Sequence, residues 1–255
     1  MLGNLFYNLS PAVRKLLTIN GVVFIGTWLF DGLQPYLAVY YPASPHFHVW
    51  QLLTHMFMHA DIWHLVFNMF ALMVFGTRVE YLWGSQRFYR YYLYCGLGAL
   101  LVYLTAQTGQ LLYIFYQNHI PFGYFWDFLK ITRTGDLSAM QDLASNIDPD
   151  TLRFIAQSWS KTMLTPMLGA SGAVYGILVA FAVYYPNEQL MLLFPPMPIR
   201  AKWLVTGLVV ISIVSGLKNN PSDNTAHFAH LGGILVGYLI LQYWFYKRNK
   251  NRRHY

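Results

Sequence analysis

Long apolar stretches without any acidic or basic side chain alternate with short polar segments along most of this chain. A helix that crosses a bilayer needs about 20 predominantly apolar residues, and flanking lysine and arginine stems can extend it. The stretch Tyr91–Trp126 exceeds one span, so we expect its first half to cross the membrane and the rest to leave it. Six helical spans are predicted, at about residues 14–32, 61–79, 91–113, 168–186, 200–217 and 226–246.

Composition agrees with a polytopic all-α membrane protein. Of the 255 residues, 56% are hydrophobic and 11% are charged, whereas soluble domains carry roughly 25% charged residues. These values argue against a soluble enzyme, a disordered chain or a fibrous repeat. The single cysteine, Cys95, excludes an internal disulfide framework and a cysteine-based zinc site. The amino-terminal residues do not follow the order of a signal peptide, so the first span is expected to be retained.

The distribution of charge predicts the orientation. With six spans, one side of the membrane holds 12 lysine and arginine residues and the other holds five. Basic residues concentrate in cytoplasmic loops, so we predict a multi-pass protein with both termini in the cytoplasm. The membrane expected is a bacterial inner (plasma) membrane. The net charge of +7 is then a topology signal. Nucleic-acid binding is not expected, because no basic face with interleaved aromatic residues lies outside the membrane ends.

The segment of about residues 117–166 interrupts the spans and contains nine of the 27 charged residues. We expect it to form an extracytoplasmic insert between the third and fourth spans. Its stretch Ile120–Lys130 is aromatic and amphipathic, which suits the lipid interface. Asp148 followed by Pro149 is typical of a helix start. With no internal repeat, residues 1–255 are treated as one membrane domain.

Strongly polar side chains inside three of the spans are candidate functional residues, because such groups are costly in a bilayer. His64 and Asn68 lie four residues apart in the second span, Ser171 begins the fourth, and His230 lies near the start of the sixth. These alternate spans all run from the outside inwards. The four side chains are therefore predicted at similar depth in the outer half of the membrane.

Glycine pairs indicate how the fourth and sixth spans meet. Gly172 is four residues from Gly176, and Gly233 is four residues from Gly237. Such small-residue stripes let helix backbones approach closely in lipid. His230 shares a face with Gly233 and Gly237, so packing through the stripes would bring it to Ser171. The alternative is that the glycines serve packing alone.

This pattern of residues is suited to nucleophilic catalysis. A serine hydroxyl needs a base to take its proton, and the His230 imidazole is the candidate. The oxyanion formed by attack on an amide needs fixed donors. Asn68, His64 and the backbone N–H of Ser171 are candidates for these. No acidic residue lies inside the three spans apart from Asp61 and Glu80 at the ends of the second, so a Ser-His dyad is favoured over a triad.

The sequence resembles the rhomboid intramembrane serine proteases across about residues 14–246. The resemblance is carried by GASG at Ser171, by HADIWHLVFN from His59 to Asn68, and by AHLGGILVG, in which glycines follow His230 at three and seven residues. It implies a six-helix bundle and a serine endopeptidase that cleaves within or beside the transmembrane helices of single-span membrane proteins.

The resemblance also implies residue roles. Ser171 would be the nucleophile and His230 the general base, with His64, Asn68 and the Ser171 amide as the oxyanion hole. Gly169 would shape the turn before the serine, and Tyr175 would lie against the His230 ring. His59 would be structural. His227 competes with His230 by proximity, but only His230 has glycines at the matching offsets.

Two features depart from the family pattern. Gln51 follows Trp50 where an arginine is common, so the anchoring of the first outer loop is expected to differ. The insert is long, and it forms either a cap that affects substrate entry or a passive surface insertion. Rival functions are an inactive rhomboid-like protein that binds membrane helices and a small transporter. No metal or cofactor constellation is present in the sequence, and the oligomeric state is left open.

Overall fold

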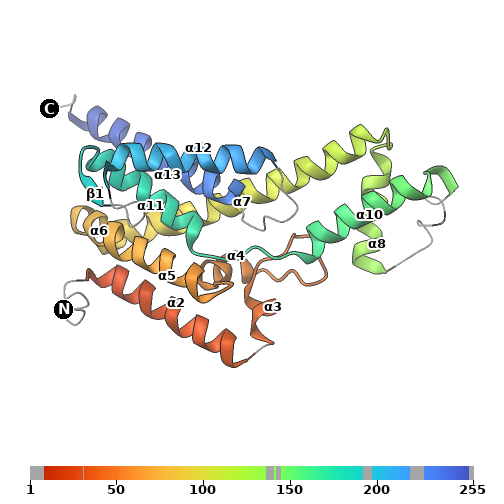
Figure 1. Ribbon diagram of the computed structural model, residues 1–255, viewed down its shortest axis with the longest axis horizontal. Helices are drawn as coiled ribbons and strands as arrows, with labels where there is room; N and C mark the ends of the chain where they lie inside the picture. Colours follow the sequence, from red (N-terminus) through yellow and green to blue (C-terminus); the bar gives the residue numbers. More distant parts are fainter. Residues whose placement is uncertain are drawn as a thin grey trace.

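The computed structural model describes residues 9–30, 32–135, 141, 145–191, 197–218 and 227–252. Helices dominate this part of the chain, and most of them run side by side in one body (Figure 1). Helix α2 (Pro11–Leu29) begins and α13 (His227–Arg252) ends at the same end of that body (Figure 1). Among the described residues, four helices are long and apolar enough to cross a membrane: Pro11–Leu29, Ile62–Trp83, Ser85–Gln117 and His227–Lys250.

The start of α2 is fixed by a carboxylate from another helix. Pro11 occupies the first helical position, where its missing N–H costs nothing. The Glu80 side chain is 2% exposed and accepts hydrogen bonds from the N–H groups of Ala12 (2.8 Å) and Val13 (2.9 Å). The Ser10 hydroxyl also donates to it, as does the Ser85 hydroxyl at 2.6 Å. One buried acid therefore joins three helix ends.

The second predicted span contains a change of helix type that sequence reasoning missed. Helix α5 (Ile62–Ala71) continues into a π-helical turn, η2 (Leu72–Gly76), and then α6 (Thr77–Trp83). A Cβ atom at Gly76 would lie 3.1 Å from side-chain atoms of both Leu72 and Val13, so the glycine permits close packing against α2. The helical run ends at Trp83, four residues beyond the predicted boundary, and Gly84 with its φ of +77° stops it.

Helix α7 (Ser85–Gln117) forms the longest element, with 33 residues. At 1.5 Å per residue it measures about 50 Å, which exceeds the roughly 30 Å hydrocarbon core. The predicted span of residues 91–113 lies inside this helix, which starts six residues before it and ends four residues after it. Its far end projects beyond the main helical body and contacts α10 (Pro149–Leu164) (Figure 1).

Helix α11 covers Ser171–Tyr184. It therefore starts at the serine itself, three residues inside the predicted span of about residues 168–186. Met167 instead forms an antiparallel bridge with Val39 of the first outer loop, and Gly169 has a φ of +127° that is incompatible with a helix. A hairpin of β1 (Gln189–Met191) and β2 (Pro198–Arg200) follows α11, with Gln189 opposite Arg200. The hairpin leads into α12 (Ala201–Lys218). Helices α11 and α12 are apolar but shorter than the other four.

The loop between α2 and α5, which the sequence predicts to be the first outer loop and which keeps that name below, carries α3 (Leu33–Leu37), α4 (Gln51–Thr54) and the 3-10 turn η1 (His55–Phe57). Gln51, fully buried, holds this loop in place. Its Nε2 donates to the carbonyl oxygens of Pro35 (3.0 Å) and His46 (2.9 Å), and its Oε1 accepts from the N–H of His48 (3.0 Å). An amide thus anchors the loop in this chain.

The insert forms a second, smaller core. It contains α8 (Gly123–Thr134) and α10, and the predicted helix start at Asp148-Pro149 is confirmed, because the Asp148 carboxylate caps α10. Trp159 of α10 donates to the Thr132 hydroxyl of α8 at 2.8 Å. Apolar side chains from α7, α8, α10 and the first outer loop meet here, namely Ala43, Leu111, Phe115, Phe125, Phe128, Ile147, Ile155, Trp159 and Met163.

We predict that Glu80→Ala destabilises the protein strongly, because four donors lose a buried charged acceptor. The expected loss in unfolding free energy is about 3 kcal/mol, measured by thermal or denaturant unfolding in detergent. The matched control is Glu188→Gln, whose partner Arg78 is 2.5 Å away on a side chain that is 49% exposed. That loss should stay below about 1 kcal/mol. Equal losses for the two variants would contradict this assignment.

Candidate active site

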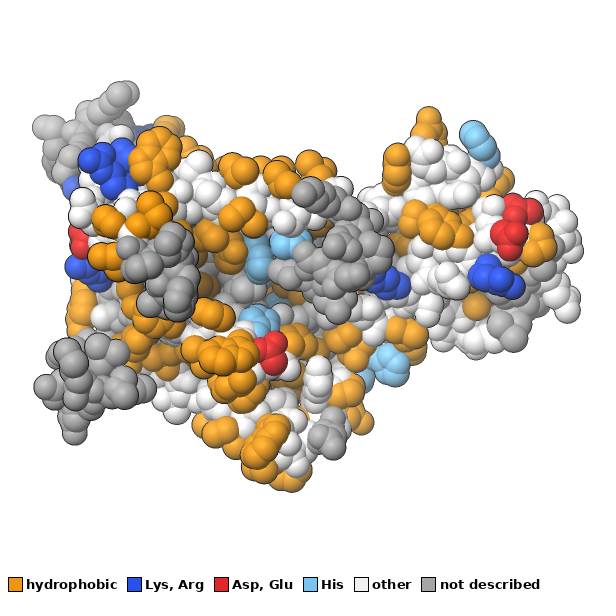
Figure 2. Space-filling view, viewed as in Figure 1, with side chains coloured by type: hydrophobic (Ala, Val, Ile, Leu, Met, Phe, Trp, Pro, Cys, Tyr) orange, Lys and Arg blue, Asp and Glu red, His pale blue; other side chains and the backbone are white. Residues whose placement is uncertain are grey.

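Ser171 and His230, 59 residues apart in the sequence, are joined by a hydrogen bond. The distance between His230 Nε2 and Ser171 Oγ is 2.9 Å. The Tyr175 ring lies one helical turn after Ser171 and stacks on the imidazole, with ring centroids 4.3 Å apart and planes within 4° of parallel. The ring of His230 is thereby held with Nε2 directed at the hydroxyl. Histidine side chains gather near the middle of one face, between the α5 layer and the α12–α13 layer (Figure 2).

Close backbone contact between α11 and α13 creates this pairing. A Cβ atom at Gly233 would lie 1.9 Å from the Gly172 carbonyl oxygen, so only glycine fits there. A Cβ atom at Gly172 would lie 2.4 Å from Cβ of Ala99 on α7. Further along, a Cβ atom at Gly237 would lie 2.6 Å from the Tyr91 hydroxyl, which donates to the Gly176 carbonyl at 2.8 Å. The predicted glycine stripes are therefore the contact surface between α11, α13 and α7.

His64 of α5 lies beside the segment that leads to the serine, and Asn68 lies one helical turn after His64. A Cβ atom at Gly169 would lie 3.0 Å from His64 Nε2 and 3.5 Å from Ser171 Oγ. The His64 ring and the Ser171 hydroxyl therefore both lie close to the backbone of Gly169. The Ala60 N–H donates to His64 Nδ1 at 3.4 Å, and this bond favours the tautomer with hydrogen on Nε2. Asn68 is buried and uses Nδ2 to donate to the His64 carbonyl at 2.9 Å.

The segment before Ser171 is held by the residues that precede α5. Gly169 donates its N–H to the His55 carbonyl at 2.9 Å, and the Asp61 side chain accepts from the His64 N–H at 2.9 Å, capping α5. Sequence reasoning noted Asp61 only as an acid at the end of a span. An acidic residue directly before an apolar run is an N-cap signal, so this cap could have been predicted. No sequence pattern of this kind predicts the hydrogen bond between the Gly169 N–H and the His55 carbonyl.

His59 lies beside His64, and His227 lies beside His230. The His59 ring packs edge-on against His64, with centroids 4.9 Å apart, and it is 4% exposed. Burial is the main reason that the pKa of His59 falls from an ordinary 6.5 to about 4, and repulsion from His64 adds to it. The ring of His227 is 6.2 Å from that of His230, whereas His230 holds the bond to Ser171.

Ser171 is the first residue of α11, and its position has a chemical consequence. The first N–H groups of a helix lack intrahelical acceptors, and they carry the positive end of the helix dipole. An anion forming at the serine would therefore meet the first backbone N–H groups of α11. The arrangement combines a hydroxyl, an adjacent imidazole and a set of hydrogen-bond donors at the end of an apolar helix.

These features define a multi-pass helical membrane protein with a serine–histidine pair. The sequence matches the family model described as "Rhomboid domain" over residues 46–115 and 150–247. The chain therefore belongs to the rhomboid family, and the resemblance seen in its motifs is confirmed.

Several curated proteins are similar to this chain. "Rhomboid protease AarA" of Providencia stuartii is 25% identical over 75% of this chain and 54% of its own length. "Rhomboid protein 1, mitochondrial" of Saccharomyces cerevisiae is 25% identical over 91% and 52%. "Rhomboid protease GluP" of Bacillus subtilis is 25% identical over 74% and 25%. The chain thus spans about half the length of the first two relatives. All three relatives are named as rhomboid proteins, and two of them are named as proteases.

We predict that Gly169→Ala removes reactivity at Ser171 without unfolding the helices. The new methyl group would sit 3.0 Å from the His64 ring at a φ of +127°, a conformation that L side chains rarely adopt. Labelling of Ser171 by a fluorophosphonate probe should fall by at least about tenfold, as expected for strain of about 1–3 kcal/mol. Gly109→Ala on α7 is the control, because its Cβ meets nothing within 4 Å. Equal labelling of both variants would contradict the prediction.

We also predict that the protein loses stability on acidification, in part through His59. Between pH 6.5 and about 4 the unfolded chain binds a proton at this imidazole that the folded protein excludes. Stability therefore falls as the pH falls through this window. Unfolding temperatures at pH 7, 6, 5 and 4.5 should decrease, with a shallower slope for His59→Asn. Exposed His119 provides the control variant, His119→Asn. A slope that His59→Asn leaves unchanged would refute a contribution from His59.

Proposed function

We propose that this chain is an intramembrane serine endopeptidase in which Ser171 is the nucleophile and His230 the general base. The observation that carries the proposal is the 2.9 Å contact between His230 Nε2 and Ser171 Oγ, in a chain that belongs to the rhomboid family. A neutral imidazole at this distance can take the hydroxyl proton as the oxygen attacks. The part of the second, fourth and sixth predicted spans that the structure describes offers no acid beside His230, which favours a dyad.

The reaction follows from these positions. Ser171 Oγ attacks the carbonyl carbon of the scissile peptide bond while its proton passes to His230 Nε2. The resulting oxyanion accepts hydrogen bonds from the Ser171 N–H, from His64 Nε2 and from Asn68 Nδ2, which still has a second hydrogen beside the one donated to the His64 carbonyl. Collapse breaks the C–N bond, and His230 returns the proton to the leaving amine. Water then attacks the acyl-enzyme by the same route.

The supporting residues act through geometry. Tyr175 holds the imidazole plane by stacking, and Gly172, Gly233 and Gly237 keep the two helices close enough for the dyad. Gly169 leaves room for the oxyanion-hole histidine. His59 packs behind that histidine and is assigned a structural role.

We propose that the whole chain, residues 1–255, is one domain with six membrane spans, which include the shorter helices α11 and α12. Helix α11 has 14 residues and measures about 21 Å, less than a full hydrocarbon core. Its first residue, Ser171, would then lie below the outer surface, where a local depression admits water. Both termini would be cytoplasmic, in a bacterial inner membrane, with the insert outside.

The substrates proposed are single-span membrane proteins, whose helices reach the site sideways through the bilayer. A peptide bond inside a helix is shielded by its own turns, so a substrate must unwind before Ser171 can reach it. Small or helix-weakening residues near the cleaved bond are expected to favour cleavage. The insert, whose helix α10 leads directly towards Ser171, is a candidate cap over the entry.

The test is cleavage of a model single-span substrate by purified protein in detergent or liposomes. Ser171→Ala and His230→Ala should each abolish cleavage, because each removes a reacting group. Tyr175→Ala should lower the rate roughly two- to tenfold, and Tyr175→Phe should retain most of it, since a stacked aromatic pair is worth about 0.5–1.5 kcal/mol.

Two outcomes would overturn the proposal. Cleavage that survives both Ser171→Ala and His230→Ala would refute the dyad. A wild-type protein that binds the substrate helix, fails to cleave it and leaves Ser171 unlabelled by a fluorophosphonate would identify an inactive rhomboid-like protein instead.

A further inference from the structure

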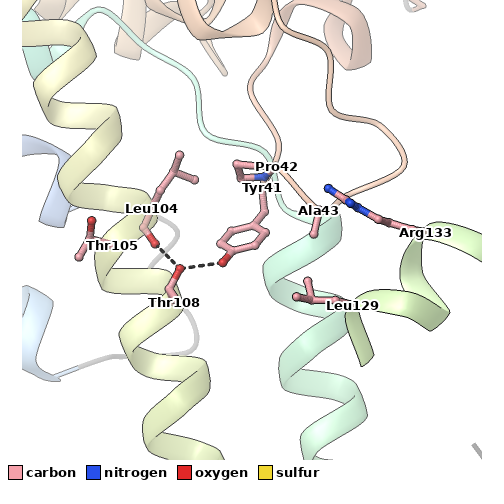
Figure 3. Close-up of a pocket in the computed structure, with 8 residues that line it drawn as sticks. All are labelled: Tyr41, Pro42, Ala43, Leu104, Thr105, Thr108, Leu129 and Arg133. Atoms are coloured by element: carbon pink, nitrogen blue, oxygen red, sulfur yellow. Dashed lines mark hydrogen bonds between the residues drawn. The ribbon is translucent and has the colours of Figure 1, made fainter. Parts of the chain in front are cut away.

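A pocket of about 320 Å³ lies between the main helical body and the insert, away from Ser171 (Figure 3). The first outer loop contributes residues 41–43, α7 contributes one face near Thr105 and Thr108, and α8 contributes Leu129 and Arg133. Its lining is apolar apart from three hydroxyl groups and one guanidinium group. No acidic residue belongs to this lining, so the pocket carries a single positive charge.

The hydrogen bonds of the pocket leave Arg133 as its anion-binding group. Thr108 donates its hydroxyl hydrogen to the Leu104 carbonyl at 2.9 Å, so the 2.7 Å contact between Tyr41 and Thr108 uses the Tyr41 hydrogen. Thr105 donates to the Leu101 carbonyl at 2.8 Å. Among the described residues, Arg133 forms no hydrogen bond or ion pair. Its planar guanidinium can bind a phosphate through two parallel hydrogen bonds.

An apolar strip on α7 leads to this pocket. Tyr94, Leu97 and Leu101 are 53%, 36% and 66% exposed, and their spacing places them on one face of the helix. That face is turned away from the bundle, because Cys95 and Ala99 on the opposite face of α7 are fully buried. Thr105, the next residue of the strip, lines the pocket. From Tyr94 to Thr105 the strip covers about 16 Å of helix, and it ends at the pocket that Arg133 of α8 lines.

We propose that this pocket binds the phosphate group of a membrane phospholipid, with Arg133 on the phosphate and an acyl chain along the strip formed by Tyr94, Leu97 and Leu101. The strip favours a lipid over free phosphate, since an apolar surface next to the cation contributes only if the ligand has a hydrocarbon chain. It also favours a lipid over an acidic peptide, since the strip belongs to a helix that is apolar and long enough to lie in the bilayer.

Binding at this place would connect the insert to the membrane. Arg133 belongs to α8, which packs on α10 through the bond between Trp159 and Thr132. The loop side of the pocket is tied to α7 through Tyr41 and Thr108. A lipid in the pocket would therefore hold α7, the first outer loop and the insert at one level relative to the bilayer surface. This inference does not depend on the proposed catalytic activity.

The experiment is native mass spectrometry of the full chain in detergent, titrated with phosphatidylglycerol and, separately, with a diacylglycerol of the same acyl chains. The wild type should retain phosphatidylglycerol and bind the phosphate-free lipid much more weakly. Arg133→Gln should weaken phosphatidylglycerol binding about tenfold, as expected for loss of a charge-assisted hydrogen-bonded contact. Leu101→Gln should also weaken phosphatidylglycerol binding, because it makes the surface proposed to contact the acyl chain polar. The matched control is Arg153→Gln, an exposed cation on α10 outside the pocket lining.

Three results would overturn the proposal. The first is equal binding of phosphatidylglycerol by wild type and Arg133→Gln. The second is an equal loss for Arg133→Gln and Arg153→Gln, which would indicate non-specific attraction to the cationic surface. The third is complete displacement of the lipid by millimolar inorganic phosphate together with no effect of Leu101→Gln, which would indicate a phosphate site without a lipid chain. Thermal unfolding of each variant checks that it is folded.

Discussion

The contact between the backbones of α11 and α13 is the constraint on which the rest of the site depends. Lipid tails are as apolar as leucine, so helices in a bilayer associate through close packing and hydrogen bonds rather than through the hydrophobic effect. At Gly172 and Gly233 even a methyl group would collide with backbone atoms of the facing helix or with Ala99. The same contact sets Ser171 against His230, so one packing feature determines both helix association and the hydrogen bond of the candidate dyad.

The end of the molecule that carries the loop between α2 and α5 is held by polar hydrogen bonds instead. The strand-like pairing of Val39 with Met167 joins the first outer loop to the segment that enters the site. Gln51 ties that loop to itself, and the His55 carbonyl holds Gly169. These bonds compensate backbone groups of irregular segments that a bilayer interior would leave without partners. The insert adds a separate aromatic core at the far end of α7, which explains how a long polar segment can follow a membrane helix and still have fixed packing.

At the opposite end, charged side chains stabilise the structure. One accepts hydrogen bonds from buried donors, and another contacts an aromatic ring. Glu80 joins the starts of α2 and α7 to the end of α6, and Arg87 lies 3.9 Å from the centroid of the Trp244 ring, a cation–π contact between α7 and α13. In a chain with only 11% charged residues, such groups act as specific ties. The two ends thus fix the helices at both levels, and the glycine contacts fix them in between.

The sequence by itself determined the helical membrane class, the polar residues that group at one depth and the glycine stripes beside them. Spacing is sufficient for this, because helix periodicity decides which residues share a face. The tertiary structure decided where helices begin and change type. The start of α11 at Ser171 depends on Gly169, His55 and Val39, which are distant in sequence. The π-helical turn depends on packing of Gly76 against α2. The tautomer of His64 and the pocket at Arg133 likewise arise from neighbours that no local pattern predicts.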